Sequence, residues 1–329
     1  MTTKAVLYGP RDLWLDHYSC EKAELGSDEL RVRTLVSALS TGTDRGNYEG
    51  AQTVPGAPEY PRWVGYSNVG EIVEIGEDIN HFRVGERIFT NRPHVSDFVI
   101  DGNDVAVKVE EAITSEEAAF TYLYFLGLLS LRRGRFVFGE TVVVVGLGVL
   151  GLATVELARA FGGRVIAVGN DPTRLSKAIE MGAHCALDYK DSTLNERVKL
   201  FTMGKNAELV VLAANPWSAY KCGVDLLGEN GRLAILSLPG RGEDALNFNP
   251  IDMNWLYKKA LHIIGVSLTK QDRDRLEDDL MFILRLINER TINPEKMITH
   301  RFLYEDMVCA YEMAYSRDKS MVGTVFQWS

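Results

Sequence analysis

A glycine-rich turn between an apolar strand and a helix constrains the fold of this chain more than any other feature. Residues 141–145 read Thr-Val-Val-Val-Val, a run typical of a strand buried on both faces. Gly-Leu-Gly-Val-Leu-Gly follows at 146–151, then an apolar helical segment reaches Phe161 and a second apolar run occupies 165–168. A strand, a G-x-G-x-x-G turn, a helix and a strand in this order predict a dinucleotide-binding unit.

Each glycine of this turn has its own predicted role. Gly146 permits the tight turn, Gly148 lets backbone amides approach a pyrophosphate, and Gly151 lets the helix lie close to the strand. The first helical residues, Val149 and Leu150, would offer free N–H groups and partial positive charge to the phosphates. The chain is therefore expected to bind NAD(H) or NADP(H).

The end of the second strand favours NADP(H) over NAD(H). NAD sites usually carry an acidic residue for the ribose hydroxyls about 20 residues after the turn, but Gly169 occupies this strand tip. Asn170 and Arg174 can donate hydrogen bonds to a 2′-phosphate, and the planar fork of arginine donors suits a phosphate well. Asp171 leaves the alternative open, because its carboxylate could turn back to the ribose of NAD.

Two positions on later strands complete the predicted nucleotide site. Tyr189, which follows the third strand, could stack on the adenine, and Ala213 ends the strand 209–213. The residues expected to contact the cofactor are Gly146, Gly148, Val149, Leu150, Gly151, Gly169, Asn170, Arg174, Tyr189 and Ala213.

Composition is that of an ordinary globular protein. The 329 residues predict two domains, and 46% hydrophobic with 25% charged residues is usual. The formal net charge of −9 argues against nucleic acid or an anionic membrane as a partner. There is no signal-peptide pattern or membrane-spanning run, and the four scattered cysteines are interpreted as reduced thiols. We expect a cytoplasmic protein that acts on a small molecule.

The order of strand and helix signals predicts an α/β protein. Short strands separated by glycines and prolines fill the first 115 residues, which indicates a β-rich, barrel-like domain. A helix with Ser115 as its cap runs to Arg132 and leads into alternating strands and helices, which predict a doubly wound parallel (Rossmann) sheet. An amphipathic helix is expected at 274–289. We assign residues 1–118 and 294–329 to the β-rich domain and 119–293 to the dinucleotide-binding domain.

The whole chain resembles the medium-chain dehydrogenase/reductase superfamily, in which a β-rich (GroES-like) catalytic domain accompanies a Rossmann domain. The resemblance rests on the glycine fingerprint and on several short segments, which are Ser40-Thr41-Gly42-Thr43-Asp44, Gly65-Tyr66-Ser67-Asn68-Val69-Gly70-Glu71, Val84-Gly85-Glu86-Arg87-Ile88, Gly231-Arg232-Leu233 and Ile264-Gly265. It implies hydride transfer in a cleft between the two domains.

The chain departs from the zinc alcohol dehydrogenases of this superfamily at the ligand positions. Thr41 matches the cysteine of their Cys-Gly-Ser/Thr-Asp motif, Tyr66 and Ser67 match a His-Glu pair, and the third ligand falls near Thr121. Zinc requires thiolate, imidazole or carboxylate ligands, so no zinc is expected. The same features and the segment 298–311 resemble a zinc-free branch that includes bacteriochlorophyllide dehydrogenase.

Without a metal, a hydroxyl must stabilise and protonate the alkoxide that hydride transfer to a carbonyl creates. Tyr66 lies at the position of a metal ligand, and Thr43 matches the family residue that relays the alcohol proton. Thr41 supplies a further hydroxyl, and Tyr122 and Tyr124 are additional candidates. Tyr66 could instead only fill the space left by zinc. The expected reaction is alcohol/carbonyl oxidoreduction; a C=C (enone or quinone) reductase and a non-catalytic nucleotide-binding protein are the alternatives.

The apolar run 260–266 predicts self-association. By its position it is the edge strand of the nucleotide-domain sheet, and an exposed apolar edge invites pairing with another chain. The superfamily commonly forms dimers by joining these edges. We therefore expect a two-fold homodimer through 260–266.

Overall fold

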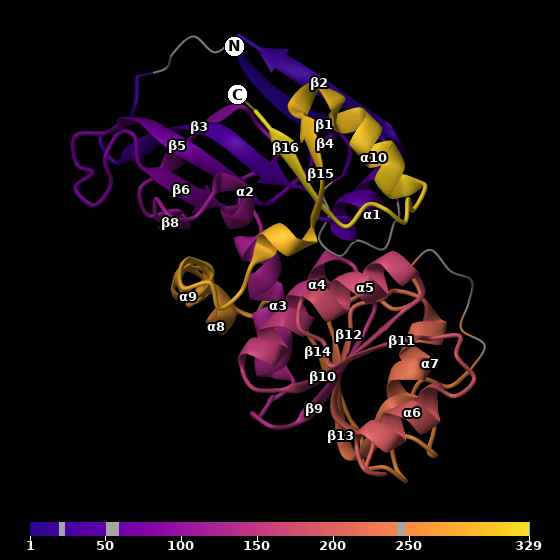
Figure 1. The fold of residues 1–329 in the computed structure, drawn as a ribbon. Helices are drawn as coiled ribbons and strands as arrows, with labels where there is room; N and C mark the ends of the chain where they lie inside the picture. The colour runs from indigo at the N-terminus through magenta and orange to yellow at the C-terminus, as the bar shows by residue number, and fades with distance from the viewer. Residues whose placement is uncertain (20–23, 51–58, 242–245, 247, 329) are drawn as a thin grey trace. The chain divides into compact units, whose positions relative to one another are not determined.

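A computed structural model describes residues 1–19, 24–50, 59–241, 246 and 248–328 of the chain. The chain folds into two compact units: unit 1 comprises residues 1–122 and 270–329, and unit 2 comprises residues 123–269 (Figure 1). The predicted boundaries were 118/119 and 293/294. The second boundary differs most, because the segment 270–293 belongs with the β-rich unit.

Unit 2 is built on a six-stranded parallel sheet with the order β11-β10-β9-β12-β13-β14. The strands are β9 (Thr141–Val145), β10 (Arg164–Gly169), β11 (Cys185–Asp188), β12 (Ala207–Leu212), β13 (Leu227–Ile235) and β14 (His262–Gly265). The helices that follow the first four of them are α4 (Val149–Ala160), α5 (Pro172–Glu180), α6 (Leu194–Phe201) and α7 (Trp217–Leu226). The chain winds outward from β9 in both directions, which confirms the doubly wound α/β fold.

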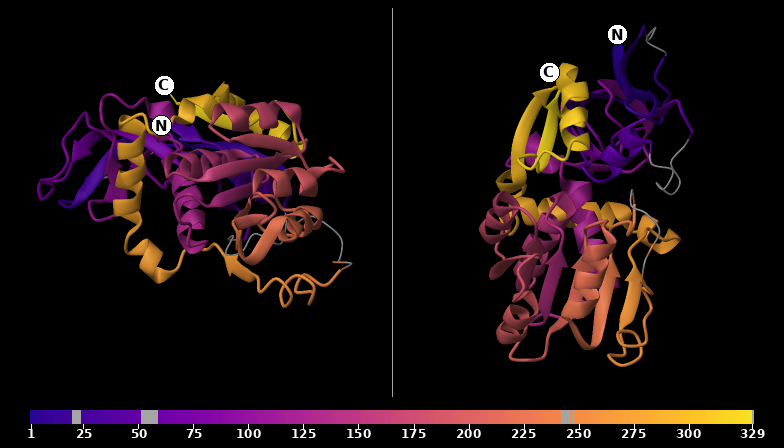
Figure 2. Two further views of the ribbon diagram at one scale, coloured as in Figure 1. Left: turned by 60° about the horizontal axis from the view of Figure 1, so that its bottom comes forward. Right: turned by 90° about the vertical axis from the view of Figure 1, so that its right-hand side faces the viewer.

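The core of unit 2 explains the uninterrupted valines of β9. Helices lie along both faces of the sheet (Figures 1 and 2). α4 contacts β9, β10 and β12, and one face of the sheet carries a core cluster that includes Val143 and Val145 with Val198 of α6 and Val224 of α7. A central strand covered on both faces has no solvent side, so it has no polar alternation.

Unit 1 contains two sheets. A three-stranded sheet has the order β2-β1-β4, from β1 (Thr2–Gly9), β2 (Asp12–Tyr18) and β4 (Arg62–Trp63). A seven-stranded sheet has the order β15-β16-β3-β5-β6-β8, with β7 paired to β3. Its strands are β3 (Glu29–Ala38), β5 (Asn68–Ile75), β6 (Arg87–Thr90), β7 (Asp97–Asp101), β8 (Ala106–Lys108), β15 (Ile298–Leu303) and β16 (Gly323–Gln327).

The helices of unit 1 are α1 (Thr43–Glu49), α2 (Ser115–Ala118), α8 (Lys270–Arg273), α9 (Leu276–Asn288) and α10 (Met307–Tyr315), with short 3₁₀ turns η1 (Pro294–Met297) and η2 (Tyr304–Asp306). They include α2, α9 and α10, each of which contacts strands of the seven-stranded sheet. The amphipathic helix expected at 274–289 is α9, and it contacts β8 and α2. Arg290, just after α9, also forms an ion pair with Glu117 of α2.

The helix expected from Ser115 to Arg132 is two helices. Thr114, not Ser115, is the cap: its hydroxyl accepts from the Glu117 N–H while the Glu117 carboxylate accepts from the Thr114 N–H, a complete capping box. α2 ends at Ala118, and α3 (Thr121–Arg133) begins after two intervening residues. The boundary between the units falls within α3, after Tyr122.

Two remaining points concern cysteines and membrane spans. Cys185, Cys222 and Cys309 are free thiols, and Cys20 lies outside the described residues. In the described part of the chain, every helix is too short or too polar to cross a bilayer.

Candidate functional site

The three glycines of the turn in unit 2 have different surroundings. Gly146 has φ of +99°, and a Cβ there would lie 2.8 Å from the Ala214 nitrogen. A Cβ on Gly151 would lie 1.8 Å from the Gly146 oxygen, so α4 sits almost directly on the turn. Gly148 precedes α4 as its N-cap, and a Cβ there would meet nothing within 4 Å. The space beside Gly148 is therefore open to a ligand. Gly146 and Gly151 instead permit the close backbone contacts of the turn with Ala214 and α4.

The strand tip that follows β10 is closed to a side chain. A Cβ on Gly169 would approach Cδ1 of Leu147 to 2.7 Å, so an acidic residue could not be placed there without moving Leu147. Asp171 caps α5: its Oδ1 accepts from the N–H groups of Thr173 and Arg174, at 3.0 and 3.2 Å. The carboxylate is buried and directed at its own helix.

The other predicted nucleotide contacts lie at the same sheet edge. Asn170 is exposed directly after β10, and Tyr189 is partly exposed after β11, with its N–H bonded to the Gly169 oxygen. Ala213 follows β12, and its N–H donates to the Val145 oxygen. Carboxyl ends of parallel strands meet at one edge, which is where doubly wound sheets bind ligands. Partial burial lowers the pKa of Arg174, and Asp171 opposes this shift.

A buried carboxylate organises the second group of candidate residues, in unit 1. Asp44 is fully buried in α1. Its Oδ2 accepts from the Ser40 N–H at 2.8 Å, and its Oδ1 accepts from the Gly65 N–H at 3.1 Å. Burial raises the pKa of Asp44 to about 6, although both N–H groups favour the ionised form. Asp44 thus holds the segment with Thr41 and Thr43 beside the segment with Tyr66.

The hydroxyl of Tyr66 lies among other hydroxyls. Tyr66 Oη donates to Ser40 Oγ at 2.5 Å, and its ring packs edge-on against Tyr122 with centroids 5.4 Å apart. Burial raises the pKa of Tyr66, the Asp44 charge raises it further, and the Ser40 and Thr43 hydroxyls oppose the shift. The phenol is therefore protonated at neutral pH. Ser40 was not among the predicted site residues, although it opens the Ser-Thr-Gly-Thr-Asp segment and could have been read from it.

The remaining candidates divide between the units. Thr41 and Thr43 are partly exposed on either side of Gly42. Tyr124 is fully buried in unit 2, where its hydroxyl donates to Glu156 at 2.5 Å. The hydroxyl of Thr121 donates to the Ala118 oxygen within its own chain segment.

These residues do not fit a zinc ion. Thr41, Tyr66 and Thr121 have no thiolate, imidazole or carboxylate, and the two oxygens of Asp44 already accept from backbone N–H groups. His94 is fully buried, its Nδ1 pairs with Ser37 Oγ at 2.8 Å, and burial lowers its pKa to about 3. Among the described residues, no three His, Cys, Asp or Glu side chains are arranged to hold a metal.

Comparison with known proteins assigns the chain to a class. Residues 149–285 match the family model described as zinc-binding dehydrogenase. Sorbitol dehydrogenase of Halalkalibacterium halodurans is 26% identical over 87% of this chain and 88% of its own length. Among solved structures, 2R,3R-butanediol dehydrogenase of Bacillus subtilis aligns with a TM-score of 0.82 and is 18% identical in sequence. A zinc-binding dehydrogenase candidate of Sinorhizobium meliloti 1021, whose structure contains NADP, aligns with a TM-score of 0.82 and is 19% identical. Each alignment covers 99% of both chains.

The chain is an NAD(P)-dependent oxidoreductase that is similar to the zinc-binding dehydrogenases. This confirms the expected enzyme class and the expected Rossmann and GroES-like architecture. The positions that the resemblance assigned to zinc ligands hold Thr41, Tyr66 and Thr121 in this chain.

Exchange of the turn glycines should separate stability from binding. Gly151→Ala would place Cβ against the Gly146 oxygen, and this overlap should destabilise the protein by about 3 kcal/mol or more, outweighing the gain of roughly 1 kcal/mol in helix propensity. Gly148→Ala should cost only about 1 kcal/mol, as an N-cap substitution, but weaken nucleotide binding. Denaturant unfolding and nucleotide titration of both variants measure this; equal stability of the two variants would contradict it.

Asp44 should make the protein's stability depend on pH. Because its folded pKa of about 6 exceeds the ordinary value of 3.8, its protonated form is favoured by folding, and this contribution is lost as pH rises from about 4 to about 6. The loss is about 3 kcal/mol, from 1.36 kcal/mol per pKa unit. The difference in unfolding free energy between wild type and Asp44→Asn should change by this amount between pH 4 and 7, with wild type relatively more stable in acid. A pH-independent difference would contradict the shifted pKa.

Proposed function

We propose that this protein is a zinc-independent, NADP(H)-dependent alcohol dehydrogenase or carbonyl reductase in which Tyr66 donates the proton. The observation that carries the proposal is the pairing of Tyr66 Oη with Ser40 Oγ at a position where the zinc enzymes have a ligand. The nucleotide on unit 2 would supply the hydride, and the hydroxyl group around Tyr66 on unit 1 would receive the substrate oxygen.

The charges around Tyr66 support the role of a donor. A phenol whose pKa is raised stays protonated at neutral pH and can give its proton to an alkoxide, which is a far stronger base. The Ser40 and Thr43 hydroxyls favour the phenolate once the proton has left, and oxidised nicotinamide would favour it further. Thr43, at the start of α1, would relay the proton onward; Thr41 would contribute a further hydroxyl.

The preference for NADP(H) is supported by the strand tip after β10. The tip offers no carboxylate at Gly169, and the Asp171 carboxylate caps α5 with its Oδ1. Repulsion of a 2′-phosphate is thereby reduced, and Arg174, in the first turn of α5, would pair with that phosphate.

Replacement of Tyr66 tests the mechanism. Tyr66→Phe should lower the rate of carbonyl reduction about 10²-fold, as expected when a positioned acid is lost, and leave nucleotide affinity nearly unchanged. Thr43→Val should lower the rate less. The measurement is steady-state NADPH oxidation with a panel of aldehydes, ketones and enones, with and without a zinc chelator, which should have no effect.

Tyr48→Phe is the matched control, because Tyr48 is buried in the same unit and its hydroxyl donates to Glu312. Full carbonyl reduction by Tyr66→Phe would remove Tyr66 from the mechanism. Enone reduction that survives the substitution would favour a C=C reductase instead. Absence of turnover with every substrate would favour a non-catalytic nucleotide-binding protein, and activity lost to the chelator and restored by zinc would refute zinc independence.

Replacement of Arg174 tests the cofactor. NADPH should bind more tightly than NADH, and Arg174→Ala should narrow the difference by about 1.5–3 kcal/mol, the contribution of a charge-assisted contact. Fluorescence titration with both nucleotides measures it. Arg159→Ala, at the carboxyl end of α4, is the control and should not change the ratio. If NADH binds more tightly than NADPH, the prediction is wrong, and the Asp171 carboxylate would instead accept hydrogen bonds from the ribose hydroxyls of NAD(H).

We also propose the two-fold homodimer through the 260–266 segment. β14 is the edge strand, paired only with β13 within the described sheet, and the turns that precede it expose Ile251, Met253 and Tyr257, the last to 75%. An open edge beside exposed apolar side chains suits a second copy of the chain.

Light scattering at micromolar concentration should therefore give twice the chain mass of 36.8 kDa. The double substitution Met253→Glu and Tyr257→Glu should yield a folded monomer. Because both side chains are exposed within one chain, the substitutions should leave the unfolding midpoint of the monomeric chain itself unchanged. A monomeric wild type would contradict the proposal.

A further inference from the structure

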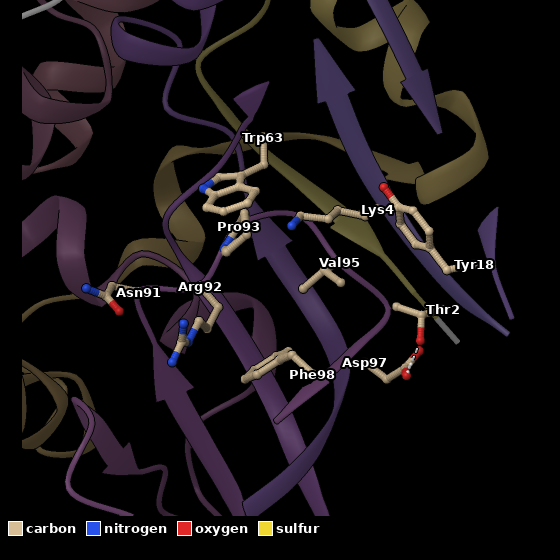
Figure 3. Close-up of a pocket in the computed structure, with 10 residues that line it drawn as sticks. All are labelled: Thr2, Lys4, Tyr18, Trp63, Asn91, Arg92, Pro93, Val95, Asp97 and Phe98. Carbon is tan, nitrogen blue, oxygen red and sulfur yellow. Dashed lines mark hydrogen bonds between the residues drawn. The ribbon is translucent and has the colours of Figure 1, made fainter. Parts of the chain in front are cut away.

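A cavity of about 510 Å³ opens in unit 1 beside the three-stranded sheet (Figure 3). Its walls come from β1, the end of β2, Trp63 of β4, and the segment 91–98 that connects β6 to β7. Its size falls in the range of small-molecule pockets, roughly 300–1,000 Å³. Tyr66, Thr43 and Thr41 are not among the residues that line it, so it is separate from the candidate catalytic residues.

The ammonium of Lys4 is the unusual group in this cavity. Its Nζ lies 3.7 Å from the centroid of the Trp63 ring, and Figure 3 shows it directed toward Trp63 and Pro93. Within the described residues it makes no hydrogen bond and no ion pair. Burial lowers the pKa of Lys4, as expected for an ammonium withdrawn from water without a counter-charge.

Two carboxylates come from the elements around Lys4, and both accept hydrogen bonds from hydroxyl groups while they keep their negative charge. Asp16 is opposite Lys4 in the register of β1 and β2, and its Oδ2 accepts from the hydroxyls of Tyr8 and Tyr18, at 2.5 and 3.2 Å. Asp97 accepts from the hydroxyls of Thr2 and Ser96, each at 2.5 Å. Both carboxylates thus accept hydrogen bonds from hydroxyl groups, and among the described residues neither forms an ion pair with Lys4.

Two other lysines that lie over aromatic rings pair with carboxylates, whereas Lys190, 5.8 Å from the ring centroid of the partly exposed Tyr189, has no ion pair among the described residues but does not line this cavity. Lys108, over Phe82, pairs with Glu86 at 2.9 Å. Lys221, over Trp255, pairs with Asp225 at 2.7 Å. Lys4 has the same kind of ring contact without the carboxylate, and that missing partner is what an anionic ligand would supply.

The rest of the cavity suits a planar apolar body. Trp63 leaves 59% of its surface exposed, and Pro93 lies beside it. Arg92, on the far wall, forms an ion pair with Asp104, so it adds little net charge. We propose that this cavity binds a small organic anion, whose carboxylate or phosphate group pairs with Lys4 while a planar apolar portion lies against Trp63 and Pro93.

The test uses the full chain and three probes: benzoate, its uncharged analogue benzamide, and inorganic phosphate. Binding is followed by the NMR signal of the Trp63 indole N–H, which is the signal absent from Trp63→Phe. Benzoate should shift it with a Kd in the millimolar range, and benzamide and phosphate should each bind about tenfold more weakly, since each lacks one of the two contacts.

Lys4→Met keeps the length of the side chain and should remove the preference for benzoate over benzamide, whereas the control Lys108→Met should retain it. Equal binding of benzamide and benzoate by the wild type would overturn the proposal in favour of an uncharged aromatic or carbohydrate-type ligand. Equal binding of phosphate would show that the ring contact contributes nothing and also overturns it. So would a Trp63 signal that stays fixed up to about 50 mM benzoate, a concentration well above the expected millimolar Kd.

Discussion

The candidate catalytic residues depend on one buried carboxylate. Asp44 accepts hydrogen bonds from the N–H groups of Ser40 and Gly65, and through these bonds it fixes the start of α1 beside the segment that carries Tyr66. An unpaired buried N–H costs free energy, so each bond specifies where its segment lies. The distance from Tyr66 Oη to Ser40 Oγ follows from this arrangement.

The electrostatics around that carboxylate differ from those of a site that holds a divalent cation. A divalent cation would favour ionised Asp44 and would lower the pKa of a nearby phenol. In this chain Asp44 faces backbone amides and phenols, so burial dominates and the pKa values of both Asp44 and Tyr66 rise. Neutral hydroxyl groups, rather than a positive charge, therefore surround the place where a substrate oxygen would lie.

Much of unit 2 could be predicted from the sequence, because its signals are local. Buried parallel strands appear as uninterrupted apolar runs, and the three glycines of the turn differ in the structure as backbone sterics require. Unit 1 was less predictable. α9 was recognised as a helix but assigned to the other domain, because its position depends on long-range packing against β8 and α2. Thr114 caps α2 because its hydroxyl accepts a hydrogen bond from the Glu117 N–H. From the sequence alone, the hydroxyl of Ser115 was an equally good cap.

The candidate site shows the same division. Asn170, Gly169 and Ala213 follow strands of one parallel sheet, so topology alone brings them to one edge. The hydrogen bond between Ser40 and Tyr66 joins residues 26 positions apart in the sequence. Hydrophobic periodicity predicts helices and strands but not such a side-chain contact. The unpaired state of Lys4 was equally invisible, because it depends on the hydroxyl partners of Asp16 and Asp97.

The pairing of β16 with β3 also determines the order in which the chain can mature. Residues 325–327 pair with residues 36–38, and the whole of unit 2 lies between them in the sequence. As a ribosome releases the chain, unit 2 can complete its sheet while unit 1 still lacks Tyr311 and Phe326 from its core. The nascent protein therefore passes through a stage with a finished nucleotide fold and an open β-rich unit. During that stage the edge of β3 that β16 later covers has no partner strand and is open to pairing with other chains.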